Sequence, residues 1–405
     1  SSDLPRKFKI AVSGGAEDRA AVAIHDIGIR IVKNDAGEIG YRIIVGGGLG
    51  RSPFIGKIVR EFLPEPELLA YLEAILRVYN LSGRRDNKYK ARIKILVHET
   101  GTEAFIAEVE RVYATMNGPT VNADPAEVAR IAAYFAPPPY EALPANSPTL
   151  ENAAAKDAGL ASFVRNNLTA HKVAGYTAVT VSAKPIDAPP GDVTSDQLRT
   201  LADLAERYSF DEARITHMQN VVLPYVKLDD VPALFAALKD AGLADANAGL
   251  ITDIISCPGL DYCTLATARS IPIAMAIQRH FADAERQQLI GQLGIKISGC
   301  INACGHHHIA GIGILGLDKG GKENYQLTLG GDPGNADDAV GATLGERLGP
   351  GIDADEVPFA IERLVDAYLD LRERDDEAFI ATVRRVGAEP FKAAFVNEEP
   401  LHAAA

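Results

Sequence analysis

The chain has 405 residues, of which 47% are hydrophobic, so it is long enough to bury two or three cores. A formal net charge of −13 argues against nucleic acid or an anionic membrane as the main partner. No apolar stretch approaches the roughly 18–20 residues that cross a bilayer, and basic residues interrupt the start, SSDLPRKFKIAVSGG, so we do not expect a signal peptide. We expect a cytoplasmic protein, in which cysteines are more often ligands or catalysts than disulfides.

The first feature along the chain is a basic segment, PRKFK, which contains Arg6, Lys7 and Lys9. Because the two lysines alternate with Phe8, both ammonium groups would project from one face of a strand. The pattern then predicts a strand over residues 9–14 and a glycine-rich loop.

Residues 25–48 follow as strand, turn and strand, and 64–81, PEPELLAYLEAILRVYNL, has the apolar spacing of an amphipathic helix. The next stretch, RRDNKYKARIK, is strongly basic and has only Asp86 to oppose its charge. One interpretation is a solvated strand edge kept soluble by lysine. The other is an anion-binding wall, since buried cations without partners cost several kcal/mol each.

A change of character occurs between residues 118 and 160. Asp124, Pro125 and Glu127 form a capping-box pattern at a helix start, and PPPYEALPANSP reads as an extended linker. Residues 161–247 then alternate strand, helix, strand pair and helix, which suits a split βαβ or ferredoxin-like unit.

The remaining segment, residues 248–405, repeats the pattern of residues 1–117. KIAVSG at 9–14 resembles GIKISG at 294–299, and the strand–turn–strand segment at 25–48 resembles HIAGIGILGLDKGGKENYQLTLGG at 308–331. A second amphipathic helix follows at 355–373. We therefore predict an α+β fold with two related α/β modules and a ferredoxin-like domain between them. The second copy is preceded by that domain, whereas nothing comparable precedes the first, so we expect an N-terminal part to be missing.

All four cysteines fall in two tight pairs, Cys257 with Cys263 and Cys300 with Cys304, separated by 36 residues. A disulfide pair is disfavoured by the expected compartment. A structural zinc site fits poorly, because five residues separate the first two cysteines. Unrelated core cysteines would not cluster in this way. An iron–sulfur cluster needs four thiolates and tolerates uneven spacing, so it is the favoured interpretation.

Local context agrees with a bound cofactor. SCPGLDYC allows a tight loop, and Gly299 and Gly305 let the backbone bend closely around a ligand. Asn302 lies between the second pair and would donate hydrogen bonds to sulfide or thiolate. Three consecutive histidines, His306 to His308, do not suit one metal ion, since three consecutive side chains on a strand do not all face one point. Hydrogen bonding near the cofactor, or packing, explains them better.

These motifs resemble the sulfite and nitrite reductase hemoproteins, which couple a [4Fe–4S] cluster to siroheme. CPGLDYC and SGCINACG carry the resemblance, together with LPRKFKIAVSG, RIIVGGGLG, RRDNKYKARIKILV and HMQNVVLP. It covers nearly the whole chain. It also implies that the N-terminal ferredoxin-like half-domain of the family is absent.

The resemblance implies roles for individual residues. The cluster ligands would be Cys257, Cys263, Cys300 and Cys304, and Cys304 would also bridge to the siroheme iron. Lys7 and Lys9 would be the catalytic lysines, which bind the anionic substrate and supply protons. The residues implied to contact the cofactors are Arg6, Arg92, Lys94, Asn302 and Cys304. Of these, Arg92 and Lys94 are the best candidates to pair with siroheme carboxylates.

The activity implied is the six-electron reduction of sulfite to sulfide, with a ferredoxin or a flavoprotein as electron donor. Reduction of nitrite to ammonia is the nearest alternative, because both substrates are small oxyanions that one basic cage can hold. A second alternative is a cluster-bearing fragment that catalyses nothing without a complementary N-terminal chain. No nucleic acid or membrane partner is expected.

Overall fold

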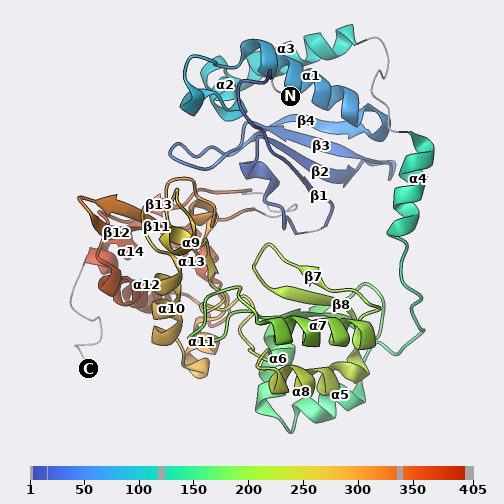
Figure 1. The fold of residues 1–405 in the computed structure, drawn as a ribbon, viewed down its shortest axis with the longest axis vertical. Coiled ribbons are helices and arrows are strands. Elements are labelled where there is room, and N and C mark those ends of the chain that lie inside the picture. Colours follow the sequence, from blue (N-terminus) through green and yellow to red (C-terminus); the bar gives the residue numbers. More distant parts are fainter. Residues whose placement is uncertain (1–2, 16, 117–123, 335–340, 397–405) are drawn as a thin grey trace. The chain divides into compact units, whose positions relative to one another are not determined.

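The structure is a computed structural model that describes residues 3–15, 17–116, 124–334 and 341–396. Two compact units are present: residues 1–136 with 332–344, and residues 137–331 with 345–405 (Figure 1). The first unit holds one hydrophobic core and the second holds two. Among the described residues, no helix has both the length and the hydropathy of a membrane-spanning segment. The cytoplasmic location stays a prediction.

The first unit is a four-stranded sheet covered on one face by helices. Its strands lie in the order β1 (Ile10–Ser13), β2 (Ile27–Lys33), β3 (Ile39–Val45) and β4 (Lys57–Pro64). The helices are α1 (Leu68–Ser82), α2 (Ile93–Thr100) and α3 (Thr102–Thr115), and all three pack on the sheet (Figure 1). Three short 3₁₀ turns also occur: η1 (Val22–Ile24), η2 (Glu65–Glu67) and η3 (Lys88–Lys90).

A further helix, α4 (Pro125–Tyr134), begins where the sequence predicts it. The Asp124 side chain accepts a hydrogen bond from the Ala126 amide and so caps the helix. Glu127 forms an ion pair with Arg130 at 2.7 Å. The helix cap by Asp124 is therefore confirmed. Glu127 pairs with Arg130 in place of the return hydrogen bond that the capping box would have made.

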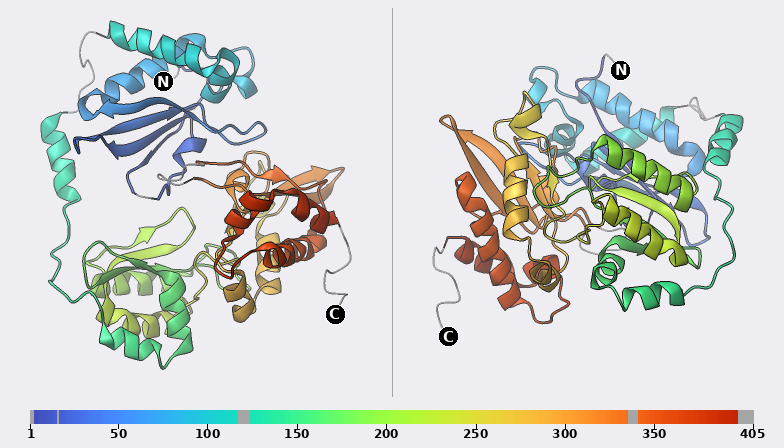
Figure 2. Two further views of the ribbon diagram at one scale, coloured as in Figure 1. Left: turned by 180° about the vertical axis from the view of Figure 1, so that it is seen from behind. Right: turned by 60° about the horizontal axis from the view of Figure 1, so that its bottom comes forward.

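The second repeat, within the second unit, has the same order of four strands and adds a fifth, β9. Its sheet has the order β13 (Glu346–Arg347), β12 (Lys322–Leu329), β11 (Ile312–Lys319), β10 (Ile295–Ser298) and β9 (Ile255–Ser256). Its helices are α9 (Gly259–Tyr262), α10 (Ile271–His280), α11 (Ala284–Ile290), α12 (Val357–Leu371), α13 (Phe379–Val386) and α14 (Glu389–Val396). The 3₁₀ turns are η5 (His307–Ile309) and η6 (Ala354–Glu356). Figure 2 shows the C-terminal helices against this sheet, where they share its core.

The two repeats agree in strand register, which confirms the duplication. In the first, β1 runs parallel to β2 with Ile10 opposite Ile27; in the second, β10 runs parallel to β11 with Ile295 opposite Ile312. In each copy a 3₁₀ turn precedes the second strand, and a residue in the left-handed region, Ala21 or His306, caps that turn. Matching backbone geometry at matching positions is what a gene duplication produces.

A glycine common to both copies leaves no room for a side chain. A Cβ added at Gly313 would lie 2.0 Å from the His307 carbonyl oxygen, and one at Gly28 would lie 2.4 Å from that of Val22. These contacts are with backbone, which moves only with the whole turn. The glycines therefore let the 3₁₀ turn pack directly on its strand.

We expect Gly313→Ala to lower the free energy of unfolding by about 3 kcal/mol, because the turn before β11 must shift to admit the methyl group. Gly294→Ala is the matched control, since a Cβ there meets nothing within 4 Å. Its effect should stay within about 0.5 kcal/mol. Urea denaturation of both variants measures the difference. Equal midpoints would show that the turn tolerates the methyl group.

The ferredoxin-like module (residues 161–247) contains the split βαβ unit. Its strands lie in the order β5 (Leu168–Ala170), β6 (Tyr176–Val181), β8 (Val221–Lys227) and β7 (Arg214–Ile215). Since β8 is antiparallel to both β6 and β7, the latter two run parallel with β8 between them. The helices in this part of the chain are α5 (Pro148–Ala154), α6 (Ala158–Asn167), α7 (Ser195–Tyr208) and α8 (Val231–Asp240), with the turn η4 (Leu228–Asp230) before α8.

Thr194 and Gln197 form a full capping box at the start of α7, as the sequence predicts for a capped helix. The α+β class is therefore confirmed, whereas the exact domain boundaries stay a prediction.

Candidate functional site

The two cysteine-bearing loops lie side by side because they leave neighbouring parallel strands. β9 pairs with β10 with Ser256 opposite Ile297, and the Cys257 amide continues the ladder by donating to the Ile297 carbonyl at 3.1 Å. Cys257 follows β9 directly, and Cys300 follows β10 after Gly299. The carboxyl ends of parallel strands lie at one edge of a sheet, so sheet topology brings both cysteine pairs to the same edge.

Backbone and hydroxyl groups hold the Cys257 sulfur. The Gly299 amide donates to Cys257 Sγ at 3.1 Å, and Ser270 Oγ lies 3.3 Å from the same sulfur. A Cβ at Gly299 would lie 2.5 Å from the Ala268 carbonyl oxygen and 2.9 Å from Gly259 Cα. Only glycine therefore lets the two loops approach this closely. An amide N–H aimed at a sulfur stabilises the thiolate form that a ligand requires.

The other three cysteines lie in short turns of the same loops. Cys263 ends α9, and its amide donates to the Gly259 carbonyl at 2.9 Å. Cys300 is buried, and the next turn passes through Ala303, which has a φ of 57°. Cys304 is exposed. The thiols thus range from buried to exposed across one sheet edge.

None of the four cysteines forms a disulfide. Within the described residues, no three His, Cys, Asp or Glu side chains are arranged to hold one metal ion. A cube of iron and sulfide is wider than one ion and separates its thiolates further. Four thiols on glycine-rich turns with an amide aimed at a sulfur fit such a cluster.

The histidine run contains one buried, unsatisfied ring. His307 is 1% exposed and takes the position that Val22 occupies in the first repeat. Neither ring nitrogen has a hydrogen-bond partner among the described residues. Burial lowers the pKa of His307 to about 3, so the ring is neutral and keeps one N–H to donate. A buried polar ring three residues after Cys304 is a feature that a bound group would satisfy.

The predicted basic residues belong to the first unit. Lys7 and Lys9 are exposed, whereas Phe8 between them packs against the core of that unit. The expected alternation is therefore present, but the strand is not: residues 7–9 precede β1, which begins at Ile10. The reason is that pairing with β2 begins only at Ile10 opposite Ile27.

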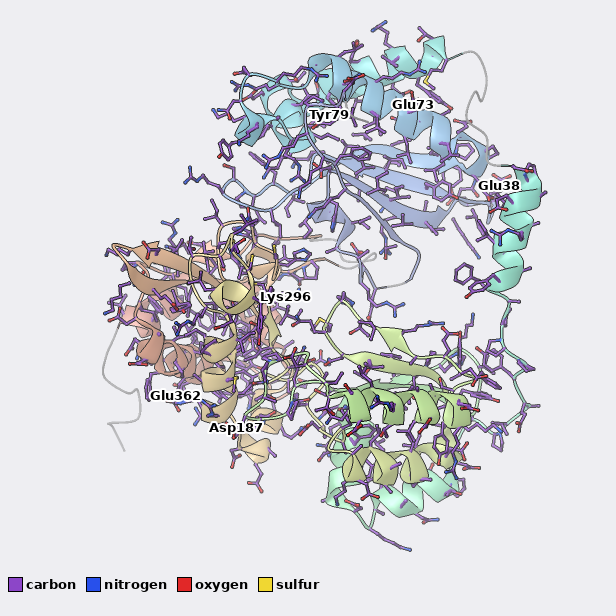
Figure 3. All side chains as sticks on the ribbon, viewed as in Figure 1. Glu38, Glu73, Tyr79, Asp187, Lys296 and Glu362 are labelled. Carbon is purple, nitrogen blue, oxygen red and sulfur yellow. The ribbon has the colours of Figure 1, made fainter. Side chains whose placement is uncertain are left out.

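A buried carboxylate that the sequence analysis missed organises this region. Asp26 is 0% exposed and forms an ion pair with Arg92, whose Nε donates to Asp26 Oδ1 at 2.9 Å. Asp26 also accepts a hydrogen bond from the Lys9 amide at 3.0 Å. In addition, the Tyr79 hydroxyl (labelled in Figure 3) donates to the carbonyls of Arg6 and Ala91. These bonds tie the backbone at the start of the chain and the Arg92 side chain to Asp26 and Tyr79.

Lys94 is buried beside this group. Its Nζ donates to the carbonyls of Leu49 and Ser52 at 2.8 and 2.6 Å, in the glycine-rich loop after β3. Burial lowers the pKa of Lys94 to about 8, with a further contribution from the positive charge of Arg92. Lys94 is therefore a buried cation that lies close to a second one, Arg92.

We expect the free energy of unfolding to rise with pH between about 8 and 10.5 because of Lys94. In that range the folded state has released the proton of this lysine, whereas the unfolded chain, with the ordinary pKa of 10.5, still binds it. Below pH 8 both states are protonated and the contribution is constant. Urea denaturation at pH 7.5 and at pH 10 measures the change in the free energy of unfolding. Lys94→Met is the reference, because the contribution of this lysine to the change is absent from it. Identical pH dependence in both proteins would contradict the expectation.

The strand-edge interpretation of the basic stretch is wrong. Residues 84–94 form a loop, the turn η3 and the start of α2. Asn87 caps η3 by accepting a hydrogen bond from the Tyr89 amide, so a turn begins where the charged stretch was interpreted as a strand edge. The stretch therefore presents its cations from a loop, and the anion-binding interpretation remains as a prediction.

The structure thus groups the predicted residues in two sets. The cysteines and Asn302, which is exposed in the turn between Cys300 and Cys304, belong to the second unit. The residues Arg6, Lys7, Lys9, Arg92 and Lys94 belong to the first. Asp26 and Ser270 were missed, since Asp26 lies in the repeated 25–48 segment, outside the basic and cysteine motifs, and Ser270 lies in no motif. The only local signal for Asp26 is an acid at the start of an apolar strand.

Comparison with known proteins decides the family. Residues 1–116 and 248–403 match the family described as nitrite and sulphite reductase 4Fe-4S domain. Residues 175–241 match the nitrite/sulfite reductase ferredoxin-like half domain. The chain belongs to the nitrite and sulphite reductase family. Its expected cofactors are confirmed accordingly: the family and its members indicate a [4Fe–4S] cluster and siroheme.

The names of the curated relatives of this chain give two different substrates. One is sulfite reductase (ferredoxin) 1 of Mycolicibacterium paratuberculosis, 27% identical over 96% of this chain and 64% of the relative. Another is ferredoxin–nitrite reductase of Synechococcus elongatus, 28% identical over 90% of this chain and 63% of the relative. The chain therefore spans less than two thirds of the length of these proteins.

A solved structure shares the fold. The NirA protein of Mycobacterium tuberculosis superposes with a TM-score of 0.70 at 26% identity, covering 96% of this chain and 65% of that protein. The agreement extends over both repeats and the ferredoxin-like module, since it covers nearly the whole chain.

Proposed function

We propose that this chain carries the cofactors of an oxidoreductase that reduces a small oxyanion, sulfite, to sulfide in a six-electron reaction. The observation that supports this most directly is the arrangement of four thiols at one sheet edge, on two loops that approach each other closely at Gly299. Cys257, Cys263, Cys300 and Cys304 would hold the [4Fe–4S] cluster, and Cys304 would also bridge to the siroheme iron. Its exposure suits a thiolate shared with a second cofactor. When bound, these cofactors would pass electrons from the donor to the substrate.

The basic residues of the first unit would serve the substrate and the siroheme carboxylates. Lys7 and Lys9 are exposed on one side of an extended segment, where two ammonium groups can bind a doubly charged anion and donate protons as oxygen leaves. Phe8 anchors that segment to the core, so the lysines are held on a fixed base.

Arg6, Arg92 and Lys94 would face the carboxylates. In the structure Arg92 is held by Asp26, and the Lys94 ammonium is held by two carbonyls. Both cations are thus fixed in position by the protein, and each keeps N–H groups for an anionic partner. Asn302, in the turn between two of the cysteines, would donate a hydrogen bond to the cluster.

Nitrite is the second candidate substrate, and the names of the relatives support this alternative. Sulfite and nitrite reductases match this chain at nearly equal identity. Ferredoxin appears in the names of both groups, so we propose a ferredoxin as electron donor, with a flavoprotein as the alternative.

The test is reconstitution under anaerobic conditions with iron, sulfide and siroheme, followed by absorption spectra and steady-state rates with each oxyanion. Chlorin bands together with iron and sulfide in excess of one heme support the proposal. A higher kcat/KM with nitrite than with sulfite would make nitrite the substrate in place of sulfite. A cluster without chlorin bands would instead support an electron carrier that does not catalyse reduction, and zinc without iron would exclude both.

A further inference from the structure

A loop of the ferredoxin-like module contacts β9, the strand that directly precedes Cys257. β9 is the edge strand of its sheet, and the Cys257 amide is committed to β10 through the Ile297 carbonyl. In a parallel pair, alternate residues direct their N–H and C=O groups to opposite sides. The N–H and C=O of Ser256 therefore point to the free edge, where an edge strand needs other partners.

Gln219 supplies both partners. The Ser256 amide donates to Gln219 Oε1 at 3.0 Å, and Gln219 Nε2 donates to the Ser256 carbonyl at 2.8 Å. The side-chain amide thus takes the place of a peptide group in a further strand. Gln219 itself has a φ of 57°, a left-handed conformation that is unfavourable for a side chain of this kind and persists only where the surroundings impose it.

Buried polar contacts fix the loop that carries Gln219. Asn220, the next residue, donates through Nδ2 to Asp253 Oδ1 at 3.0 Å. Asp253 also forms an ion pair with Lys184, and the two side chains are 3% and 0% exposed. Lys184 Nζ donates in addition to the Met218 carbonyl. Burial lowers the pKa of Lys184, and the charge and hydrogen bond of Asp253 oppose that effect.

We propose that Gln219 is a positioning residue for the first cluster cysteine, so that the ferredoxin-like module takes part in building the [4Fe–4S] site. By holding both backbone groups of Ser256, it fixes the next residue, Cys257, at the position where the Gly299 amide reaches its sulfur. This inference rests on the proposed role of Cys257 as a ligand.

The test compares Gln219→Met, which keeps the length of the side chain without its hydrogen bonds, with Gln197→Met. Gln197 is a matched control because it also bonds two backbone groups, the Thr194 amide and the Ala241 carbonyl, in the same module. Asp187→Asn is a second control, since Asp187 (labelled in Figure 3) joins the module to the last turn of α10 through Arg279. Gln219→Gly tests the backbone, because glycine adopts a positive φ without strain.

The readouts on the loaded protein are the rate of iron release to a chelator, the electron paramagnetic resonance spectrum of the reduced cluster, and amide hydrogen exchange. We expect both Gln219 variants to release iron about tenfold faster, the effect of losing two hydrogen bonds of ordinary strength. Exchange should increase at Ser256, with an altered cluster spectrum. Both control variants should match the wild type in all three measurements.

The outcomes separate this inference from the proposed function. If both Gln219 variants behave like Gln197→Met while Cys257→Ser loses the cluster, the positioning role is wrong and the ligand role stands. If Cys257→Ser retains the cluster of the wild type, both ideas fail together. If Gln219→Gly is destabilised globally, Gln219→Met still decides. Met, like Gln, is unbranched at Cβ, so this variant places the same demand on the backbone.

Discussion

Cys304→Ser is expected to lower the rate of sulfite reduction by more than about 100-fold. Loss of residues that merely support metal ligands costs 10–100-fold in comparable sites, and this change would remove a ligand proposed to join two cofactors. Cys304 is the exposed member of the four, whereas Cys300 is buried. Cys304 is therefore the cysteine best placed to be shared between the cluster and the siroheme. The variant should also lose the magnetic coupling between cluster and siroheme, which Mössbauer spectroscopy measures.

Asn302→Ala is the neighbouring control for this change. Asn302 lies exposed in the same turn, and its removal deletes a hydrogen-bond donor without deleting a thiolate. We expect it to shift the cluster potential and to keep the coupling. If Cys304→Ser kept both the coupling and the wild-type rate, the bridging role would be wrong and the other three cysteines would need a different fourth partner.

Lys7→Ala is expected to lower kcat by about 100-fold while both cofactors remain bound, since a positioned proton donor contributes at least that much. Lys7 is exposed and lies next to Phe8, which anchors the segment, so its removal should leave the fold unchanged. Cofactor content from absorption spectra, and kcat from steady-state kinetics, separate binding from turnover.

Lys33→Ala provides the reference for Lys7→Ala. Lys33 is an exposed lysine at the end of β2 in the same unit, so its removal changes the net charge by the same amount. Its kcat should equal that of the wild type. Normal turnover in Lys7→Ala would remove this residue from the active site, whereas an equal loss in both variants would indicate a general effect of charge.

Much of the fold follows from patterns that are local in the sequence. The repeat predicts two sheets with the same register, and Ile10 opposite Ile27 with Ile295 opposite Ile312 agree with it. The amphipathic helices predicted at 64–81 and 355–373 are present as α1 and α12, each after a 3₁₀ turn. Such features are predictable because periodicity and turn residues act within a few positions.

In the basic stretch, local sequence patterns do not predict the observed secondary structure. One interpretation of the strongly basic residues 84–94 was a solvated strand edge, but Asn87 starts a turn and α2 begins at Ile93. Similarly, Lys7 and Lys9 alternate with Phe8 as in a strand, although β1 begins after them. In both places the residue pattern is compatible with an extended chain, and the presence or absence of a neighbouring strand decides the outcome.

The sequence by itself determined the chemistry of the site: the thiols, their pairing in two glycine-rich turns, and the cations near the start, because these depend on which residues are present and how they are spaced. Only the tertiary structure decided the partners, such as Asp26 for Arg92, 66 residues away, and Gln219 for Ser256, 37 residues away. A hydrogen bond between distant residues leaves no periodic trace. It depends on where sheet edges and loops come to lie when the cores form.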